Sequence, residues 1–441
     1  MHRPTAEEKK LAGEVNAWAM QRLTYRDDTF PGQGRPAPLP PIDDSGIGAT
    51  EAWRVLRDDV MPTAVPADHP RYLAFVGGSP TVMSVVADIA VSAASVYAGS
   101  ALEGGEVVEA EGAALRWLAE LLGMPDSAFG TFVSGGSTAN LSALVAARYD
   151  CRRRTGRQPT LLVAGYSAHA SIASAAEIMG CELVMDGDGD GRLDAAALRR
   201  VLDRTPVDDI IAVVATAGAT NTGAVDDLAG AALLCRENGL WLHVDAAYGG
   251  AALLSDAARP QFRGIEASDS VTVDPHKWLF APFDCAAVIY RDPERARRAH
   301  TQVASYLEAV SGDHHVNPSD YAIHLTRRAR GIPLWLSLMA NGTAAYRTAV
   351  EHCLVLAAYA ARRIAASPCL EIGSTPSLSV VLFRRAGWSA TQYHAWSARS
   401  IANRLGLVTP TEHNGETMFR FCFVNPVTST GDVDQILAHI D

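Results

Sequence analysis

The sequence predicts an α/β protein built around a mainly parallel sheet, with a smaller α+β domain at its C-terminal end. Apolar strands alternate with helices through the middle of the chain, at residues 182–185, 193–202, 210–215 and 228–238. This alternation is typical of a parallel sheet whose two faces are covered by helices. From a helix near residues 346–366 onward the alternation is lost, which predicts a separate unit.

Three regions are predicted along the chain. Residues 1–68 form an N-terminal arm, in which a helix at 6–23 precedes a segment at 31–44 rich in Pro and Gly. Residues 69–343 form the large domain that contains the sheet. Residues 344–441 form the small C-terminal domain.

The composition excludes several classes of function. The 441 residues carry a net charge of −11, so no basic surface for nucleic acid is expected and binding to anionic membranes is disfavoured. No apolar run is long enough to span a bilayer, and the N-terminus lacks the apolar core of a signal peptide. The seven cysteines lack the paired spacing of a disulfide framework or a zinc site. We therefore expect a cytoplasmic protein without a metal, a nucleic-acid partner or a membrane partner.

One lysine is set apart from the other cations. The chain has 38 Lys and Arg residues, but only Lys9, Lys10 and Lys277 are lysines. Lys277 follows the short strand 271–273 and precedes an apolar loop. Unlike arginine, a desolvated lysine can lose its proton and attack a carbonyl, which favours a chemical role for Lys277. A structural lysine near the core is the alternative.

An acidic residue follows the strand upstream of Lys277. Asp245 ends the apolar strand 241–244, and ligand-binding groups of α/β sheets gather where strands end. Asp245 and Lys277 are therefore expected to face one pocket. Pyridoxal phosphate requires this pair, because an amine binds its aldehyde and a carboxylate keeps its ring nitrogen protonated.

A third motif precedes a helix that extends to about Arg148. Gly135, Gly136 and Ser137 open this helix, where free N–H groups, a hydroxyl and the helix dipole favour a phosphate. Two glycines before a helix can also form an ordinary turn, so this motif alone is weak evidence.

Together these motifs resemble a known family. HVDAAYGG at 243–250, DPHKW at 274–278 and SGGSTAN at 134–140 are similar to segments of the group II pyridoxal-phosphate-dependent amino-acid decarboxylases. That family includes aromatic amino-acid, histidine and glutamate decarboxylases, and the resemblance runs from about His69 to the C-terminus. It implies a fold-type I enzyme with a seven-stranded sheet, pyridoxal 5′-phosphate as cofactor, and a homodimer with shared active sites.

The resemblance also implies a role for each matching residue. Lys277 carries the cofactor, Asp245 holds its ring nitrogen, and His169 stacks on its ring. The phosphate is held by Gly135, Gly136 and Ser137. Further cofactor contacts are implied for Thr220, Ala247, Asp274 and His276. The substrate side of the pocket is implied for Phe75, Gly77 and Gly78, although a strand followed by a glycine turn explains those residues equally well.

The acid that protonates the substrate carbon is harder to identify. Residues 311–318 have no periodicity and several turn residues, which predicts a mobile loop like the one that supplies a tyrosine in the resembling enzymes. Tyr321 is the first choice, but it lies a few residues closer to Arg327 than the family pattern has it. His324, Tyr306 and His315 remain alternatives.

Two further groups of charged residues are ambiguous. Glu103, Glu106 and Glu109 recur at helical spacing, which usually indicates a solvated face. The alternative is that they select a cationic or amine-bearing substrate. Arg384 and Arg420 lie in strand-like segments, where salt bridges at the edge of the core are expected.

The sequence therefore predicts a carboxy-lyase that converts an aromatic or otherwise specialised L-amino acid to its amine and CO₂. An oxidative aldehyde synthase and a carbon–carbon lyase on the same scaffold are alternative functions. A non-catalytic protein that binds the cofactor or a partner is a third.

Overall fold

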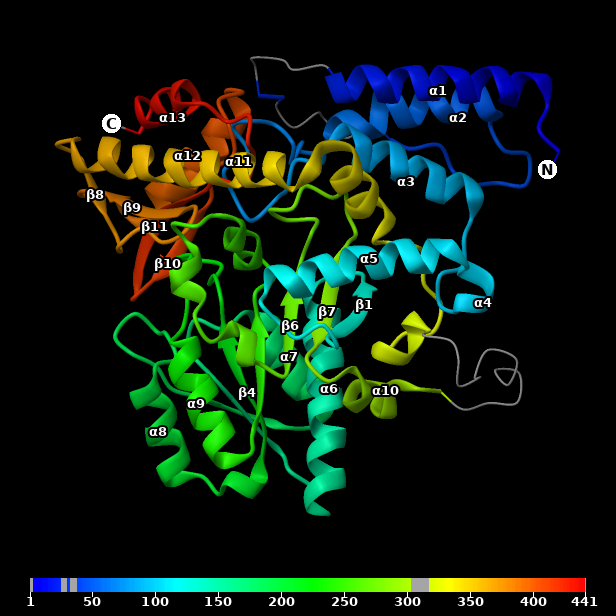
Figure 1. Cartoon of the computed structure of the whole chain (residues 1–441). Coiled ribbons are helices and arrows are strands. Elements are labelled where there is room, and N and C mark those ends of the chain that lie inside the picture. Colours follow the sequence, from blue (N-terminus) through cyan, green and yellow to red (C-terminus); the bar gives the residue numbers. More distant parts are fainter. Residues whose placement is uncertain (1–2, 25–29, 32–37, 303–316, 441) are drawn as a thin grey trace.

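A computed structural model describes residues 3–24, 30–31, 38–302 and 317–440 (Figure 1). Its large sheet has seven strands in the order β1-β7-β6-β5-β4-β2-β3. The strands are β1 (Phe129–Val133), β2 (Leu161–Ala164), β3 (Glu182–Met185), β4 (Ile210–Thr216), β5 (Trp241–Asp245), β6 (Ser270–Val273) and β7 (Ala286–Tyr290). Only β7 runs antiparallel to its neighbours, so the predicted mainly parallel seven-stranded sheet is confirmed.

Helices cover both faces of this sheet. They are α5 (Glu106–Leu121), α6 (Gly136–Thr155), α7 (Ala170–Met179), α8 (Ala195–Arg204), α9 (Leu228–Asn238) and α10 (Pro293–His300). Strand β4 shows how the faces divide, because Val213 packs into the core that includes α8 and α9, whereas Val214 packs into the core that includes α6 and α7. Every residue of β4 is buried. The continuous apolar run in its sequence follows from this burial on both faces.

The C-terminal part forms a second, antiparallel sheet with the order β10-β11-β9-β8. Its elements are β8 (Leu370–Ile372), β9 (Val380–Arg385), α12 (Ala390–Ala402), β10 (Pro410–His413), β11 (Glu416–Cys422) and α13 (Thr430–Leu437). The long helix α11 (Ile332–Ala365) leads into it and begins well before the predicted helix at 346–366. Gly342 adopts a φ of 73° inside α11 and kinks it, and Pro333 occupies the first turn, where no N–H is required.

A segment near the N-terminus is bonded to this small sheet. The backbone N–H of Leu73 donates to the Leu407 carbonyl at 2.9 Å, and the N–H of Leu407 donates to the Arg71 carbonyl at 2.9 Å. The N–H of Cys422 donates to the Leu73 carbonyl at 3.0 Å. Residues 71–73 are therefore held by the last part of the chain, although the sequence groups them with the large domain.

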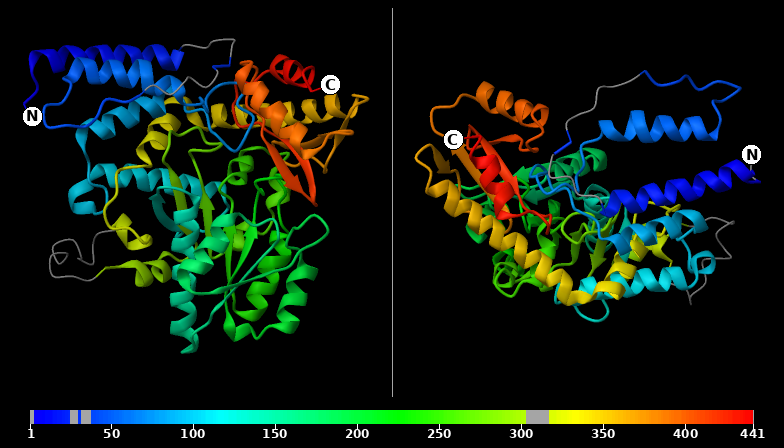
Figure 2. Two further views of the ribbon diagram at one scale, coloured as in Figure 1. Left: turned by 180° about the vertical axis from the view of Figure 1, so that it is seen from behind. Right: turned by 90° about the horizontal axis from the view of Figure 1, so that it is seen from above.

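The N-terminal helices α1 (Ala6–Thr24), α2 (Ala49–Arg54) and α3 (Val82–Ala94) lie in succession above the large sheet (Figures 1 and 2). The indole rings of Trp18 and Trp53 join α1 to α2 edge to face, with their centroids 5.4 Å apart. Helix α3 packs against α11, but α2 has no buried residue in this single chain. The outer N-terminal helices therefore leave much of their surface uncovered.

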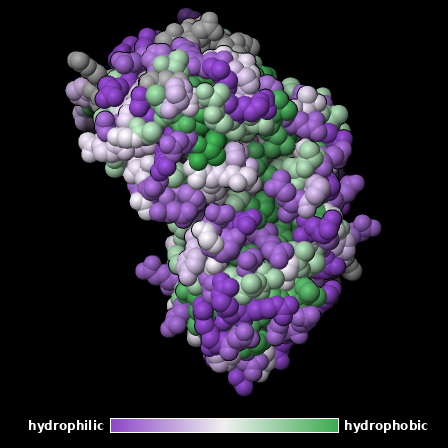
Figure 3. Space-filling view, turned by 90° about the vertical axis from the view of Figure 1, so that its left-hand side faces the viewer, coloured by the Kyte–Doolittle hydropathy of each residue, from purple (hydrophilic) through white to green (hydrophobic). Residues whose placement is uncertain are grey.

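The surface is largely hydrophilic on the face seen in Figure 3, with smaller hydrophobic patches between the polar residues. Within the described ranges, no helix combines the length and the hydropathy needed to cross a bilayer. The same ranges contain no group of three His, Cys, Asp or Glu side chains arranged to bind a metal.

One buried ion pair joins α5 to the segment before α11. Glu111 and Arg327 are both about 2–3 % exposed, and the guanidinium donates two hydrogen bonds of 2.7 Å to the carboxylate. Glu111 also accepts a hydrogen bond from the Gly331 N–H, and Arg327 donates another to the Ala98 carbonyl. Each charge is thus compensated only while its partner is present.

We expect Glu111→Ala to lower the free energy of unfolding by about 3–5 kcal/mol, because it leaves a buried guanidinium without its partner. The double variant Glu111→Leu/Arg327→Met should recover most of this loss, since it buries no unpaired charge. Denaturant unfolding of the cofactor-free protein measures both. Arg384→Ala removes an exposed arginine that pairs with Glu371 and Glu416, and serves as the control with an effect below about 1 kcal/mol. A single variant as stable as this control would contradict the expectation.

Candidate active site

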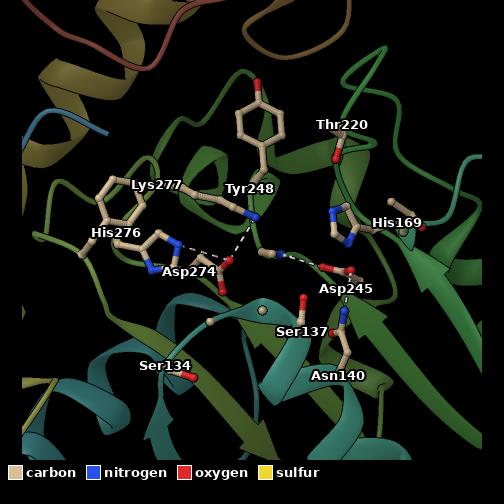
Figure 4. Close-up of a pocket in the computed structure, with 16 residues that line it drawn as sticks. Ser134, Ser137, Asn140, His169, Thr220, Asp245, Tyr248, Asp274, His276 and Lys277 are labelled. Carbon is tan, nitrogen blue, oxygen red and sulfur yellow. Dashed lines mark hydrogen bonds and ion pairs between the residues drawn. The ribbon is translucent and has the colours of Figure 1, made fainter. Parts of the chain in front are cut away.

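A cavity of about 360 Å³ lies where the carboxyl ends of β4, β5 and β6 meet the N-terminus of α6 (Figure 4). This is the position at which open α/β sheets bind ligands. The structure brings together ten residues that the sequence assigned to the cofactor site: Gly135, Gly136, Ser137, His169, Thr220, Asp245, Ala247, Asp274, His276 and Lys277.

The N-terminus of α6 forms one wall of the cavity. Gly135 caps this 20-residue helix, and no side chain bonds to its first N–H groups. Those N–H groups and the helix dipole favour an anion. A Cβ on Gly136 would lie 2.8 Å from an oxygen of Asp274, which explains why glycine occupies that position.

Asp245 enters the cavity from the end of β5. Its side chain is 5 % exposed, so its charge needs partners inside the protein. The amide of Asn140 donates to Oδ2 at 2.8 Å, and the backbone N–H of Ala247 donates to Oδ1 at 3.1 Å. The carboxylate is thereby held in one orientation toward the cavity.

Lys277 points into the same cavity from the loop after β6. Its Nζ lies 2.9 Å from Oδ2 of Asp274 (Figure 4). Burial opposes the ammonium charge, but the carboxylates of Asp274 and Asp245 outweigh it and raise the pKa of Lys277. The neutral amine expected from desolvation is therefore not the state of Lys277 while Asp274 is its partner.

His276 and Asp274 complete this wall. The Nδ1 of His276 accepts a hydrogen bond from the Cys285 N–H at 3.1 Å, and its Nε2 lies 3.7 Å from Oδ2 of Asp274. Burial lowers the pKa of His276. The other carboxylate oxygen of Asp274 is buried and accepts no hydrogen bond from the described residues.

His169 stands across the cavity from Lys277 (Figure 4). It precedes α7, where its Nδ1 accepts a hydrogen bond from the Ser171 N–H at 3.1 Å. The imidazole thus caps a helix and also lines the cavity.

The three predicted substrate-side residues, Phe75, Gly77 and Gly78, do not line the cavity. A Cβ on Gly78 would lie 2.1 Å from the Lys277 carbonyl oxygen, so this segment runs directly against the lysine loop. Phe75 has a positive φ of 52° and an exposed side chain. Gly77 is buried against Tyr72.

Tyr321 is placed away from the cavity of its own chain. It lies in the short helix Pro318–Tyr321, is 4 % exposed, and packs with its ring 5.8 Å from that of Phe129. Burial raises the pKa of Tyr321 to about 12. This position does not support Tyr321 as the acid for its own cavity. His324 is also absent from the lining, whereas Tyr306 and His315 lie outside the described residues.

Other residues of the lining were not predicted, namely Ser134, Asn140, Thr216, Gly218, Tyr248 and Phe283. Asn140 and Tyr248 lie inside motifs that the sequence singled out, but polar or aromatic type alone does not distinguish a lining residue from a core residue. Tyr248 stacks on Trp278 with ring centroids 5.3 Å apart, and its hydroxyl bonds to Ser379 of the small domain.

Arg420 does not form the salt bridge that the sequence predicts for it. Arg384 pairs with Glu371 and Glu416 as predicted, because it lies at an exposed strand end. Arg420 is only 4 % exposed and has no ion pair among the described residues. Its Nη1 donates to the Phe75 carbonyl at 2.9 Å, while its Nε and Nη2 are buried without a hydrogen-bond partner in the described chain.

Comparison with known proteins agrees with this geometry. Residues 51–386 match the model of the pyridoxal-dependent decarboxylase conserved domain. The aromatic-L-amino-acid decarboxylase of Bacillus atrophaeus is 32% identical over 90% of this chain and 86% of that protein. The L-2,4-diaminobutyrate decarboxylase of Rhizobium meliloti is 30% identical over 96% of this chain and 88% of that protein.

The fold is also found among solved structures. Catharanthus roseus tryptophan decarboxylase in complex with L-tryptophan superposes with a TM-score of 0.87, at 20% identity, over 100% of this chain and 98% of that chain. At this identity the likeness establishes the architecture, whereas the choice of substrate depends on side chains.

The ion pair with Asp274 makes the reactivity of Lys277 testable. Only the neutral amine attacks an aldehyde, and Asp274 raises the pKa of that amine. Asp274→Asn should therefore lower the pKa, and each unit of decrease raises the neutral fraction at neutral pH about ten-fold. The rate at which pyridoxal, which lacks the phosphate, reacts with the cofactor-free protein across a pH series measures this pKa. Lys277→Ala gives the background from other amines. An unchanged pH profile in Asp274→Asn would contradict this explanation.

Proposed function

Because the chain belongs to the family of pyridoxal-dependent decarboxylases, we propose that it converts an L-amino acid to its amine and CO₂. The cofactor of this chemistry is pyridoxal 5′-phosphate. The observation that carries the proposal is that the Lys277 amine and the Asp245 carboxylate enter one cavity from the ends of adjacent strands.

The side chains in the cavity fit this cofactor. The uncapped N-terminus of α6 suits its phosphate, and Asp245 suits its ring nitrogen. Lys277 supplies the amine that binds its aldehyde, and the aromatic ring of His169 lines the same cavity. An amine, a carboxylate and an anion site in these positions are what the cofactor requires.

Asp245 and Lys277 have different roles in the proposed reaction. When bound, the cofactor accepts the electron pair that the departing carboxylate leaves on the substrate. Asp245 would keep the ring nitrogen of the cofactor protonated, and Lys277 would hold the cofactor through its amine until a substrate amine replaced it. One proton must then reach the substrate carbon to give the amine. Because Tyr321 is buried away from the cavity, Tyr306 and His315 stay the proposed donors of this proton.

We propose that Arg420 binds the carboxylate of the substrate. Its buried guanidinium retains two unpaired nitrogens beside the Phe75–Gly78 segment, which itself lies against Lys277. Its charge also acts on Tyr248, where it opposes the increase of the pKa that burial causes. A buried cation with free donors is costly unless a ligand anion completes its hydrogen bonds.

We also propose a homodimer that the N-terminal helices help to form. The uncovered layer around α1, α2 and α3 exposes large apolar side chains: Ile42, Ile47, Leu56, Met61, Val82 and Ile89. Apolar surface of this kind is typical of an interface.

Glu103 and Glu106 are exposed as well, so their proposed role in selecting an amine-bearing substrate stays a prediction. A cytoplasmic location is supported by the seven free cysteines, five of them buried.

The first test is the visible absorbance of the purified protein with pyridoxal phosphate, followed by CO₂ and amine detection with a panel of aromatic and diamino L-amino acids. We expect a lysine-dependent absorbance band, and equal amounts of CO₂ and amine from one substrate class. Lys277→Ala should lose both the band and turnover. Release of hydrogen peroxide and ammonia would instead indicate an aldehyde synthase, and a cofactor-free spectrum would overturn the proposal.

The role of Arg420 is tested separately. Arg420→Gln should decrease kcat/KM by about 100-fold, because it removes a charge-assisted hydrogen bond to the substrate. The absorbance of the bound cofactor should be unchanged. Arg384→Gln, which changes an arginine on the neighbouring strand β9, should keep the wild-type kcat/KM. Equal kcat/KM values for the two variants would exclude Arg420 from substrate binding.

A further inference from the structure

A row of buried hydrogen bonds begins at Trp241 and leads to the cavity. The indole Nε1 of Trp241 lies 2.9 Å from the hydroxyl of Ser270, and this hydroxyl lies 2.9 Å from Nδ1 of His243. The other ring nitrogen of His243, Nε2, lies 3.0 Å from Oδ1 of Asn140. Trp241, Ser270, His243 and Asn140 are all less than 2 % exposed, so water does not compete for these bonds.

The row divides at Asn140 and reaches the cavity at two points. The Nδ2 of Asn140 donates to Oδ2 of Asp245 at 2.8 Å and to the Ser171 hydroxyl at 3.0 Å. The Ser171 hydroxyl lies 2.9 Å from Nδ1 of His169. A single amide therefore contacts the carboxylate assigned to the ring nitrogen and, through one serine, the histidine assigned to the ring face.

The direction of the hydrogen bonds between Trp241 and Asp245 follows from these two end residues. An indole N–H can only donate, and an ionised carboxylate can only accept. Asp245 therefore requires the NH₂ group of Asn140, which turns the amide oxygen toward His243. That oxygen needs the proton on Nε2 of His243, so Nδ1 must accept from Ser270, whose oxygen accepts from Trp241. Burial supports the neutral imidazole by lowering the pKa of His243 to about 4, against the opposing effect of Asp245.

The direction of the hydrogen bonds between Asn140 and His169 follows from Ser171. Its hydroxyl oxygen accepts from Asn140, so its own proton is available to Nδ1 of His169. The backbone N–H of Ser171 also donates to this Nδ1, at 3.1 Å. The backbone N–H requires an unprotonated Nδ1, which leaves Nε2 as the ring nitrogen that carries hydrogen.

We propose that Asn140 is a positioning residue that orients Asp245 and, through Ser171, keeps His169 neutral with its proton on Nε2. The inference rests on the roles proposed above for Asp245 and His169. A neutral histidine can donate a hydrogen bond into the cavity without placing a second positive charge next to a protonated ring nitrogen. The Nδ2 group of Asn140 thus acts on both cofactor-site residues, on Asp245 directly and on His169 through Ser171.

The protonation state is measured directly on the cofactor-free protein by ¹⁵N NMR of histidine-labelled samples, with the His169 signals assigned by comparison with His169→Gln. We expect the wild-type protein to show the neutral, Nε2-protonated form at neutral pH. A protonated or Nδ1-protonated His169 would overturn the inference. This result does not depend on the cofactor, so it stands apart from a failure of the proposed function, which would appear as no cofactor band in the wild type.

The role of Asn140 is tested with Asn140→Leu, which keeps the branched shape of the side chain and removes every side-chain hydrogen bond. We expect a mixed protonation state at His169 and about ten-fold weaker binding of pyridoxal phosphate, because Asp245 keeps only the Ala247 N–H. Asn425→Leu is the matched control, since Asn425 is equally buried but bonds to the Asp68 carbonyl away from the cavity. Wild-type His169 signals in Asn140→Leu would overturn the inference. If that variant does not fold, Ser171→Ala removes one link and should shift the His169 signals toward a mixture, whereas unshifted signals would again overturn it.

Discussion

The buried carboxylate of Asp245 is the group on which the arrangement of the cavity depends. A negative charge at the end of a central strand is stable only when hydrogen-bond donors or opposite charges lie near it, and these groups come from three parts of the chain. The amide of Asn140 comes from α6, the N–H of Ala247 from the turn after β5, and the charge of Lys277 from the loop after β6. The parallel sheet makes this possible because its adjacent strands end at one edge.

Local sequence patterns predicted the strands of the large sheet and the helix start that forms the anion site. The apolar run of β4 indicated a strand buried on both faces, and glycines before a helix indicated an anion site. The resemblance to a family then assigned residues to that edge, and the ten cofactor-site residues do line one cavity. Each of them lies near the end of a strand or the start of a helix, where the neighbouring sequence determines position.

Contacts between distant residues could not be predicted in this way. Asn140 and Asp245 are 105 residues apart, and the sequence contains no sign that one orients the other. Arg420 was expected to form a salt bridge because a strand-edge arginine usually does. Its Nη1 instead donates to the Phe75 carbonyl, and its Nε and Nη2 have no hydrogen-bond partner among the described residues. Tyr321 matched a motif approximately, but its ring packs beside Phe129 in the core. The early start of α11 was missed because Gly342 interrupts the helical pattern without ending the helix.

The bonding of residues 71–73 to Leu407 and Cys422 has a consequence for the newly made chain. Synthesis proceeds from the N-terminus, so the segment leading to Phe75 emerges more than three hundred residues before the strand that holds it. The large sheet is complete once β7 has left the ribosome, but residues 71–73 do not yet have their hydrogen-bond partners. A nascent chain would therefore acquire the cavity at the sheet edge first, and the bonded N-terminal segment only when translation is nearly finished.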